Sequence, residues 1–208
     1  MRLVFVHGWA LGPDIWDLLA PRLGAFKQTR ANLGYFGAPD LPQGRSDDVL
    51  VGHSAGLAWG LSSRKDWAAV VAINAFSRFT LDGVGRGCVQ PAALRAMRKS
   101  LVRDPQACVA AFRASIGAPP ASGPAQGAAL ADGLDLLRDF DAAPQTATIP
   151  WLVLGADNDA LAPASESRAL ATPMQGKLAL NASGGHGLPW TAPEFCAARI
   201  GDFLREHG

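Results

Sequence analysis

A short apolar run enters a turn of small residues at positions 49–57, VLVGHSAGL. The G-x-S-x-G pattern that begins at Gly52 is typical of a strand that ends in a tight turn and continues as a helix, with the serine hydroxyl held in open space. Glycine is needed on both sides of the serine because side chains there collide with the adjacent strand and helix. Residues 57–61, LAWGL, have helix-compatible spacing. The sequence therefore predicts strand, turn and helix in succession and makes Ser54 a candidate nucleophile; a chance Gly-Ser turn is the alternative.

A serine hydroxyl needs an adjacent base, which is itself oriented by a carboxylate. The chain offers four histidines: His7, His53, His186 and His207. His207 is the penultimate residue and is expected to fray, and His53 is expected to point away from the neighbouring serine hydroxyl. His7 ends the first predicted strand, far from the position of a base in this chain order. His186 lies in a glycine-rich stretch, SGGHG, after the apolar run 177–182. It is the candidate base, and a surface histidine without a role is the alternative.

Two aspartates compete for the carboxylate role. Both follow the apolar run WLVLG at 151–155, within the stretch ADNDALAP. We favour Asp159 because it stands four residues before Pro163 in a D-x-L-x-P arrangement. Asp157 would instead hydrogen-bond to the backbone of its own turn, which is a common role for aspartate in loops.

Acyl transfer also requires hydrogen-bond donors aimed at the developing oxyanion. One donor is expected to be the backbone N–H of Ala55, directly after the serine. The other is expected from the loop that follows the run LVFV at 3–6, where HGWA supplies the backbone N–H of Trp9. The indole of Trp9 is expected to wall an acyl pocket, to be a core aromatic, or both.

Composition bounds the class of protein. A chain of 208 residues at 49% hydrophobic is long enough for one domain with a sizeable core. Its 19 Lys and Arg against 18 Asp and Glu leave a net charge of +1, so no global field favours nucleic acid or a membrane. The N-terminal residues do not show the pattern of a signal peptide. No apolar run approaches the roughly 20 residues that a membrane-spanning helix needs. Three scattered cysteines suggest reduced thiols. We therefore expect a cytoplasmic monomer without a metal or organic cofactor.

Short apolar runs alternate with helical stretches along the chain, which predicts an α/β fold. We expect a mostly parallel sheet of about six strands with helices on both faces. The predicted strands lie near 2–7, 27–32, 48–53, 69–74, 150–155 and 177–182, and the predicted helices near 13–24, 55–64, 164–172 and 192–206. The core would comprise 1–75 and 150–208, and a small helical cap, 76–149, would be inserted between two core strands. Within the cap we expect helices at 91–99, 105–115 and 130–140.

The cap is expected to cover Ser54 and to supply much of a substrate pocket. The candidate pocket residues are Phe76, Phe79, Phe112 and Leu134 or their neighbours. The cap is also basic up to Gly117, through Arg86, Arg95, Arg98, Lys99, Arg103 and Arg113. A solvated helix face is the favoured reading of these charges, and a docking patch for an acidic partner is the alternative.

Six stretches together carry a resemblance to a known family. They are LVFVHGWALGPDIW (3–16), LGYFG (33–37), VLVGHSAGLAW (49–59), LADGLDLLRDFD (130–141), PWLVLGADNDALAP (150–163) and GGHGLPWTAPEFC (184–196). On these the chain resembles the α/β-hydrolase superfamily and, within it, the pimeloyl-[acyl-carrier protein] methyl ester esterases of biotin synthesis. The order Ser, Asp, His along the chain is that of the α/β-hydrolases.

The resemblance implies an α/β-hydrolase fold and a serine carboxylesterase acting on pimeloyl-[acyl-carrier protein] methyl ester. It implies Ser54, Asp159 and His186 as a catalytic triad, with Trp9 and Ala55 as oxyanion donors. It further implies a substrate-lining segment in the cap, Phe112, Arg113, Ala114, Ser115 and Ile116, and a small ester presented on an acyl carrier protein bound by cap arginines. A short cap and one additional residue after Gly155 depart from the family's pattern, so a general short-chain carboxylesterase stays open. A non-catalytic binding protein on the same fold is the third reading.

Overall fold

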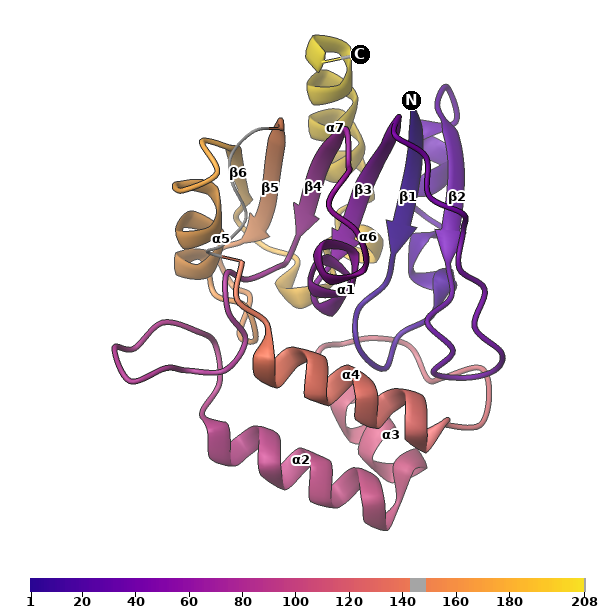
Figure 1. The fold of residues 1–208 in the computed structure, drawn as a ribbon, viewed down its shortest axis with the longest axis vertical. Helices are drawn as coiled ribbons and strands as arrows, with labels where there is room; N and C mark the ends of the chain where they lie inside the picture. The colour runs from indigo at the N-terminus through magenta and orange to yellow at the C-terminus, as the bar shows by residue number, and fades with distance from the viewer. Residues whose placement is uncertain (143–148, 208) are drawn as a thin grey trace.

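A computed structural model describes residues 1–142 and 149–207 of the chain. Within these residues the strands form one sheet in the order β2-β1-β3-β4-β5-β6, and every neighbouring pair is parallel (Figure 1). All six predicted strands are present, each within a residue of its expected bounds. They are β1 (Arg2–Val6), β2 (Lys27–Ala31), β3 (Asp48–His53), β4 (Ala69–Ile73), β5 (Trp151–Ala156) and β6 (Lys177–Asn181).

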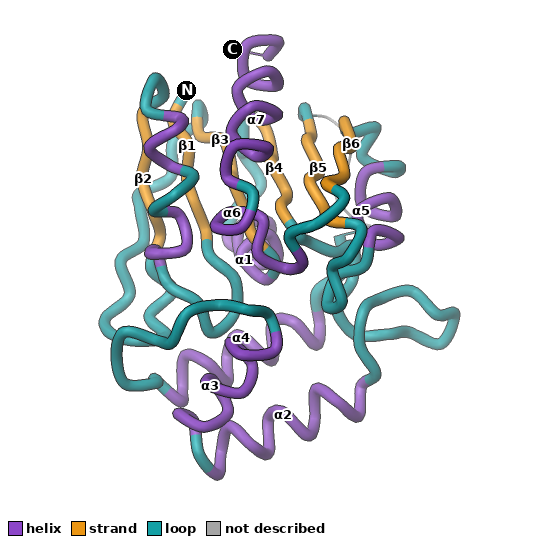
Figure 2. Tube along the Cα trace, turned by 180° about the vertical axis from the view of Figure 1, so that it is seen from behind, coloured by secondary structure: helices purple, strands orange, loops and turns teal. Residues whose placement is uncertain are grey.

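Both faces of the sheet are covered. Successive residues such as Leu50 and Val51 of β3 belong to two different apolar cores, because side chains alternate across a strand. One core contains α1 (Ala55–Ser63) and α5 (Ala164–Ala171), and the other contains residues of α6 (Leu188–Thr191) and α7 (Pro193–His207) on the opposite face (Figure 2). The central strands β3, β4 and β5 are buried throughout. This burial explains their almost continuous apolar sequences.

The prediction of a single helix at 13–24 is wrong. Two short 3₁₀ helices, η1 (Pro13–Trp16) and η2 (Ala20–Leu23), occupy this interval. The reason is Pro21, which has no N–H to donate and whose ring collides with the preceding turn of an α-helix.

Three helices lie together beyond the carboxyl ends of the strands (Figures 1 and 2). They are α2 (Pro91–Arg103), α3 (Pro105–Ser115) and α4 (Gly127–Asp139). The side chain of Asp104 accepts a hydrogen bond of 2.9 Å from the N–H of Ala107 and so caps α3 directly after α2 ends. We interpret residues 76–149 as the cap, although residues 143–148 of that interval lie outside the described residues. No helix in the described part of the chain is long and apolar enough to cross a membrane.

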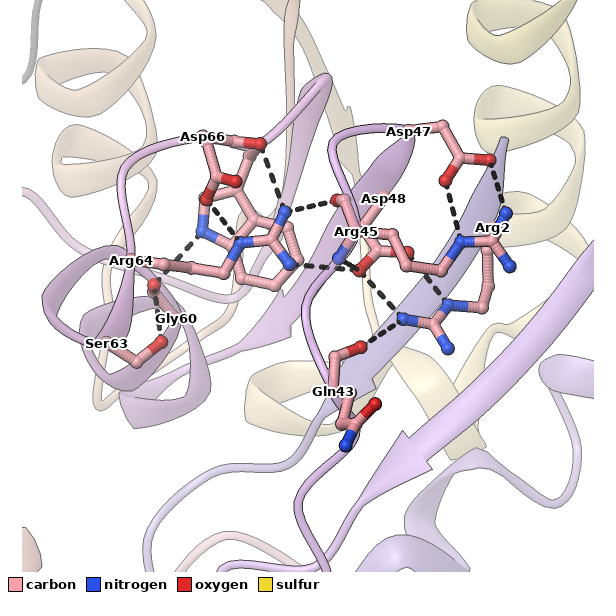
Figure 3. A network of polar contacts seen from close by, with 10 residues as sticks. Arg2, Gln43, Arg45, Asp47, Asp48, Gly60, Ser63, Arg64 and Asp66 are labelled. Carbon is pink, nitrogen blue, oxygen red and sulfur yellow. Dashed lines mark hydrogen bonds and ion pairs between the residues drawn. The ribbon is translucent and has the colours of Figure 1, made fainter.

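A network of charged side chains joins the sheet to α1 at the opposite end from the cap (Figure 3). Its centre is Asp48, the fully buried first residue of β3. The carboxylate accepts hydrogen bonds from Arg2 Nε at 2.8 Å and Arg64 Nη1 at 3.0 Å. It also accepts one from the N–H of Arg45 at 2.9 Å. Burial acts to raise the pKa of Asp48, but these donors outweigh it and hold the pKa below its usual value.

We predict that Asp48→Asn lowers the free energy of unfolding by about 3 kcal/mol at pH 7, because it removes the buried charge that the partly buried guanidinium groups of Arg2 and Arg64 share. A carboxylate whose pKa is lowered by folding stabilises the protein above its unfolded pKa. Its contribution is lost as the pH falls through the lower, folded value. The difference in free energy of unfolding between wild type and variant, measured by urea denaturation, should therefore be constant from neutral pH down to about 5. It should shrink below about pH 4. Asp66→Asn is the matched control, because Asp66 pairs with the same Arg64 at 2.8 Å but is 69% exposed. It should cost less than about 1 kcal/mol, and equal losses would contradict the assignment.

Candidate active site

Ser54 occupies a strained turn between β3 and α1. Its backbone has φ 54° and ψ −124°, a combination that non-glycine residues rarely adopt. The flanking glycines make the turn possible. A Cβ on Gly52 would lie 2.7 Å from the Cα of Leu57, and a Cβ on Gly56 would lie 2.1 Å from the carbonyl oxygen of Val6. The helix can therefore begin directly against the sheet, as the G-x-S-x-G pattern predicts.

Ser54, His186 and Asp159 are joined by two hydrogen bonds. His186 Nε2 lies 2.9 Å from Ser54 Oγ, and His186 Nδ1 lies 2.9 Å from Asp159 Oδ2. All three residues are buried. They follow β3, β5 and β6, and they meet because parallel strands place their carboxyl ends at one edge of the sheet. With Nδ1–H donating to the carboxylate, Nε2 is left to accept the serine proton.

The loop after β5 keeps Asp159 ionised. Asp159 Oδ1 accepts hydrogen bonds of 2.9 Å from the N–H groups of both Leu161 and Ala162. Burial acts to raise the pKa of Asp159, but the hydrogen bond with His186 and these N–H donors outweigh it, so the pKa is lowered. Asp157 is exposed, and its N–H bonds to the carbonyl of Asn181 at 2.9 Å. The structure thus brings Asp159, rather than Asp157, to the imidazole.

Asn74, which sequence reasoning missed, holds both the acid and the histidine loop. It follows β4, is fully buried and has φ 47°. Its Nδ2 donates to Asp159 Oδ2 at 2.9 Å and to the carbonyl of Gly185 at 3.0 Å. Its Oδ1 accepts from the N–H of Leu188 at 3.1 Å. A signal was present in the sequence, since Asn74 is the one polar residue in the run AVVAINAF, at the carboxyl end of a central parallel strand.

His53 supports His186 from the turn itself. Its Nε2 lies 2.8 Å from the carbonyl oxygen of His186, and the two rings are 5.1 Å apart. Burial lowers the pKa of His53 to about 3, so the ring is neutral and Nε2–H donates. His7 is also buried and neutral, with its pKa lowered to about 4 by burial. Its Nε2 accepts from the N–H of Leu33 at 3.1 Å, away from the serine.

Two backbone segments lie beside Ser54 where oxyanion donors are expected. Ala55 is the first residue of α1, so no carbonyl within the helix accepts from its N–H. A Cβ on Gly8 would lie 3.1 Å from the Cβ of Ser54, so the backbone that leads into Trp9 passes next to the serine. The indole of Trp9 donates to the carbonyl of Leu130 in α4 at 2.8 Å and packs edge-on against Phe112. The indole is therefore a buried core contact.

A cavity of about 380 Å³ opens next to His186, between the cap and the loops that follow β5 and β6. Among the described residues its walls carry no charged side chain, so it suits an uncharged, mostly apolar ligand. It is lined by Phe79, Val89, Ala93, Leu94, Met97, Phe112, Ser115, Ile116, Asn158, Ala160, Leu161, Gly185 and His186.

Several residues expected at the pocket lie elsewhere. Arg113 is buried and donates to backbone carbonyls, and Ala114 is exposed on the outside of α3. Phe112, Ser115 and Ile116 share the side of the helix that faces the cavity, whereas the two residues between them are rotated away from it. Phe76 packs in the core against Phe79 and Phe140, and Leu134 is buried in α4.

Comparison with known proteins identifies the family. No family model matches the chain. The chain is 30% identical to the pimeloyl-[acyl-carrier protein] methyl ester esterase of Aromatoleum aromaticum, in an alignment that covers 98% of each protein. The chain belongs to this esterase family. It is therefore an enzyme of the hydrolase class, as the sequence resemblance implied.

Solved structures show the same fold at lower identity. A bromoperoxidase from Bacillus anthracis superposes with a TM-score of 0.82 at 19% identity, covering 98% of this esterase and 91% of the other chain. An esterase from Exiguobacterium antarcticum superposes with a TM-score of 0.82 at 15% identity, and the match covers 99% of this chain and 92% of the other. A thermophilic esterase from Thermogutta terrifontis superposes with a TM-score of 0.77 at 20% identity, and the match covers 100% of this chain and 90% of the other. These likenesses confirm the predicted α/β-hydrolase fold.

We predict that Asn74→Ala lowers the free energy of unfolding of this esterase by about 1–3 kcal/mol, because it strips hydrogen bonds from buried groups. Urea denaturation measures the change. Asn158→Ala is the matched control, since Asn158 contacts the same loop through Gly185 N–H at 2.8 Å but is exposed. The control should cost less than about 1 kcal/mol. A loss as large in the control as in Asn74→Ala would contradict the role assigned to the buried amide.

Proposed function

We propose that this enzyme is a serine carboxylesterase that works through an acyl-enzyme on Ser54. The supporting observation is the continuous pair of 2.9 Å hydrogen bonds from Ser54 Oγ through His186 to Asp159. A buried serine, an imidazole and an ionised carboxylate in this order are the parts that nucleophilic acyl transfer requires. The adjacent cavity gives an ester room to present its carbonyl.

The mechanism follows from this geometry. His186 Nε2 accepts the proton of Ser54 as Oγ attacks the ester carbonyl, and Asp159 stabilises the imidazolium that forms. The N–H groups of Ala55 and Trp9 bind the oxyanion; loss of one such donor typically costs about 3–4 kcal/mol of barrier. The alcohol leaves with the proton held by His186. Water, deprotonated by the same imidazole, then attacks the acyl-enzyme and releases the acid.

We propose pimeloyl-[acyl-carrier protein] methyl ester as the substrate, with methanol as the leaving alcohol and a place in biotin synthesis. The family relative of that name supports this proposal. The uncharged lining of the cavity also supports it, because such a cavity accepts a methylene chain ending in a neutral methyl ester and disfavours a free carboxylate. The same site would serve a general short-chain carboxylesterase, since the cap decides which esters fit. We place the enzyme in the cytoplasm, as a monomer.

The proposed carrier protein would bind the outer side of α2. Arg95, Lys99 and Arg103 are exposed and recur every four residues, so they share one side of this helix. The inner side of α2 contributes Ala93, Leu94 and Met97 to the cavity. A carrier docked on α2 would therefore lie close to the cavity that accepts its acyl chain. Arg113, counted among the basic cap residues in the sequence, is buried and unavailable to a partner.

Ser54→Ala is expected to abolish hydrolysis of a short p-nitrophenyl ester without changing the circular dichroism spectrum, because alanine lacks the attacking oxygen. Asp159→Asn should lower kcat on the order of 10⁴-fold, since it disturbs the imidazole tautomer. The exposed Asp157→Asn is the matched control and should leave kcat nearly unchanged. Activity retained by Ser54→Ala, or greater damage from Asp157→Asn, would overturn the assignment.

Complementation separates the two substrates. Expression in a biotin-requiring strain that lacks its own methyl ester esterase should restore growth without biotin. The Ser54→Ala variant should fail to do so in the same strain. Failure of the wild-type enzyme, together with rapid hydrolysis of short p-nitrophenyl esters, would favour the general carboxylesterase.

Reversing the charges on the outer side of α2 tests whether the carrier protein binds there. The triple variant Arg95→Glu, Lys99→Glu, Arg103→Glu should raise KM for the carrier-linked methyl ester by about tenfold or more, since like charges then face the acidic carrier. The KM of the wild-type enzyme for this substrate should also rise with salt. A p-nitrophenyl ester without a carrier is the control substrate. An equal loss on both substrates, or no loss on either, would contradict docking on α2.

A further inference from the structure

Two hydrogen bonds join the cap to the loop that carries the proposed Trp9 donor. We call residues 7–11 the oxyanion loop. Trp9 Nε1 donates to the carbonyl of Leu130 in α4 at 2.8 Å. Arg113 of α3 donates from Nη1 to the carbonyl of Ala10 at 2.9 Å. The oxyanion loop is thus bound to two different cap helices.

All three nitrogens of the Arg113 guanidinium donate to backbone carbonyls. Besides Ala10, its Nε donates to the carbonyl of Pro119 at 2.6 Å and its Nη2 to that of Pro120 at 3.4 Å. The fork of one arginine therefore ties α3, the segment after it and the oxyanion loop together. Lysine, with a single ammonium group, lacks this planar fork.

Burial of the Arg113 guanidinium costs free energy, because the charge loses its contact with water. Arg113 is 2% exposed, and the nearest carboxylate, Asp14, is 4.0 Å from Nη2. A buried cation is retained only where hydrogen bonds compensate for the lost water. For Arg113 these are mainly the three carbonyls, with the ring of Phe36 5.6 Å from the guanidinium carbon. The side chain does not line the cavity, so ligand contact is not what holds it there.

Ala10 itself has an unusual backbone. Its φ is 54°, in the left-handed region that alanine seldom adopts. Such a conformation persists where the surrounding structure holds it. Two hydrogen bonds hold the backbone around Ala10. The N–H of Leu11 donates to the carbonyl of Gly8 at 3.3 Å and closes a turn, and Arg113 donates to the carbonyl of Ala10.

We propose that Arg113 is a positioning residue for the oxyanion hole. By holding the carbonyl of Ala10, it fixes the direction of the Trp9 N–H one residue earlier. This inference rests on the proposed function. Its consequence is that the cap contributes to the rate of the chemical step as well as to the fit of the substrate.

Arg113→Lys tests the proposal on p-nitrophenyl acetate, a substrate too small to depend on the cap. The variant should lower kcat by about 10²-fold, the loss expected when a catalytic donor is displaced, and should change KM by less than about threefold. Arg78→Lys is the matched control. Arg78 also clamps the cap, through the carbonyl of Thr80 at 3.1 Å and Asp141 at 2.9 Å, but does not touch the oxyanion loop. It should retain kcat within about threefold.

Two inhibitors separate positioning from general loosening of the cap. An octyl trifluoromethyl ketone forms a tetrahedral serine adduct whose oxyanion occupies the hole, whereas octyl methyl ketone fills the same cavity without adding to the serine. Arg113→Lys should weaken the first in parallel with kcat/KM and leave the second unchanged. Equal weakening of both, or a kcat within about threefold of wild type, would overturn the inference.

Circular dichroism establishes that each variant is folded. Should Arg113→Lys not fold, Arg113→Gln, which removes the buried charge but keeps an amide donor, is measured in the same way. Ser54→Ala is assayed alongside. Turnover retained by Ser54→Ala would defeat the proposed function itself. An inactive Ser54→Ala together with a normal Arg113 variant would defeat only the positioning role.

Discussion

The site depends on close contact between backbone segments at the turn that carries Ser54. Gly56 lies so near β1 that a Cβ there would be 2.1 Å from the carbonyl oxygen of Val6. This contact forces α1 to begin immediately after β3 and holds Ser54 at φ 54°. It also brings the first N–H of the helix and the oxyanion loop to the same point in space. A single methyl group in place of a glycine hydrogen would separate these parts.

Around that turn the parallel sheet collects polar side chains from four successive strand ends. Ser54, Asn74, Asp159 and His186 follow β3, β4, β5 and β6, and hydrogen bonds of 2.9 Å connect them. The histidine lies on a short loop, yet the loop is held in place. His53 binds the carbonyl of His186, and Asn74 binds Gly185, directly before the histidine, and Leu188, two residues after it. In the proposed mechanism, a base held in this way loses little energy to reorganisation when the serine proton moves. The cap then adds the cavity and, through Arg113, a hold on the oxyanion loop.

Local sequence patterns predict the strands, the turn at Ser54 and the histidine loop well, because each depends on neighbours a few residues away. The helix expected at 13–24 fails for a local reason too, the missing N–H of Pro21. The contacts that Asn74 and Arg113 make could not be predicted from the sequence, since their partners lie far along the chain. Asn74 meets Gly185, and Arg113 meets Ala10. Which residues of 112–116 face the cavity also depends on how α3 is rotated against the core, which tertiary packing decides.

The most direct test of this account is a crystal structure of the enzyme after reaction with an alkyl p-nitrophenyl phosphonate. We expect one covalent bond, from phosphorus to Ser54 Oγ. We also expect the phosphonyl oxygen at about 3 Å from the backbone nitrogens of both Ala55 and Trp9, and the alkyl chain in the cavity beneath α2 and α3. A label on another residue, or a phosphonyl oxygen turned away from those two N–H groups, would contradict it.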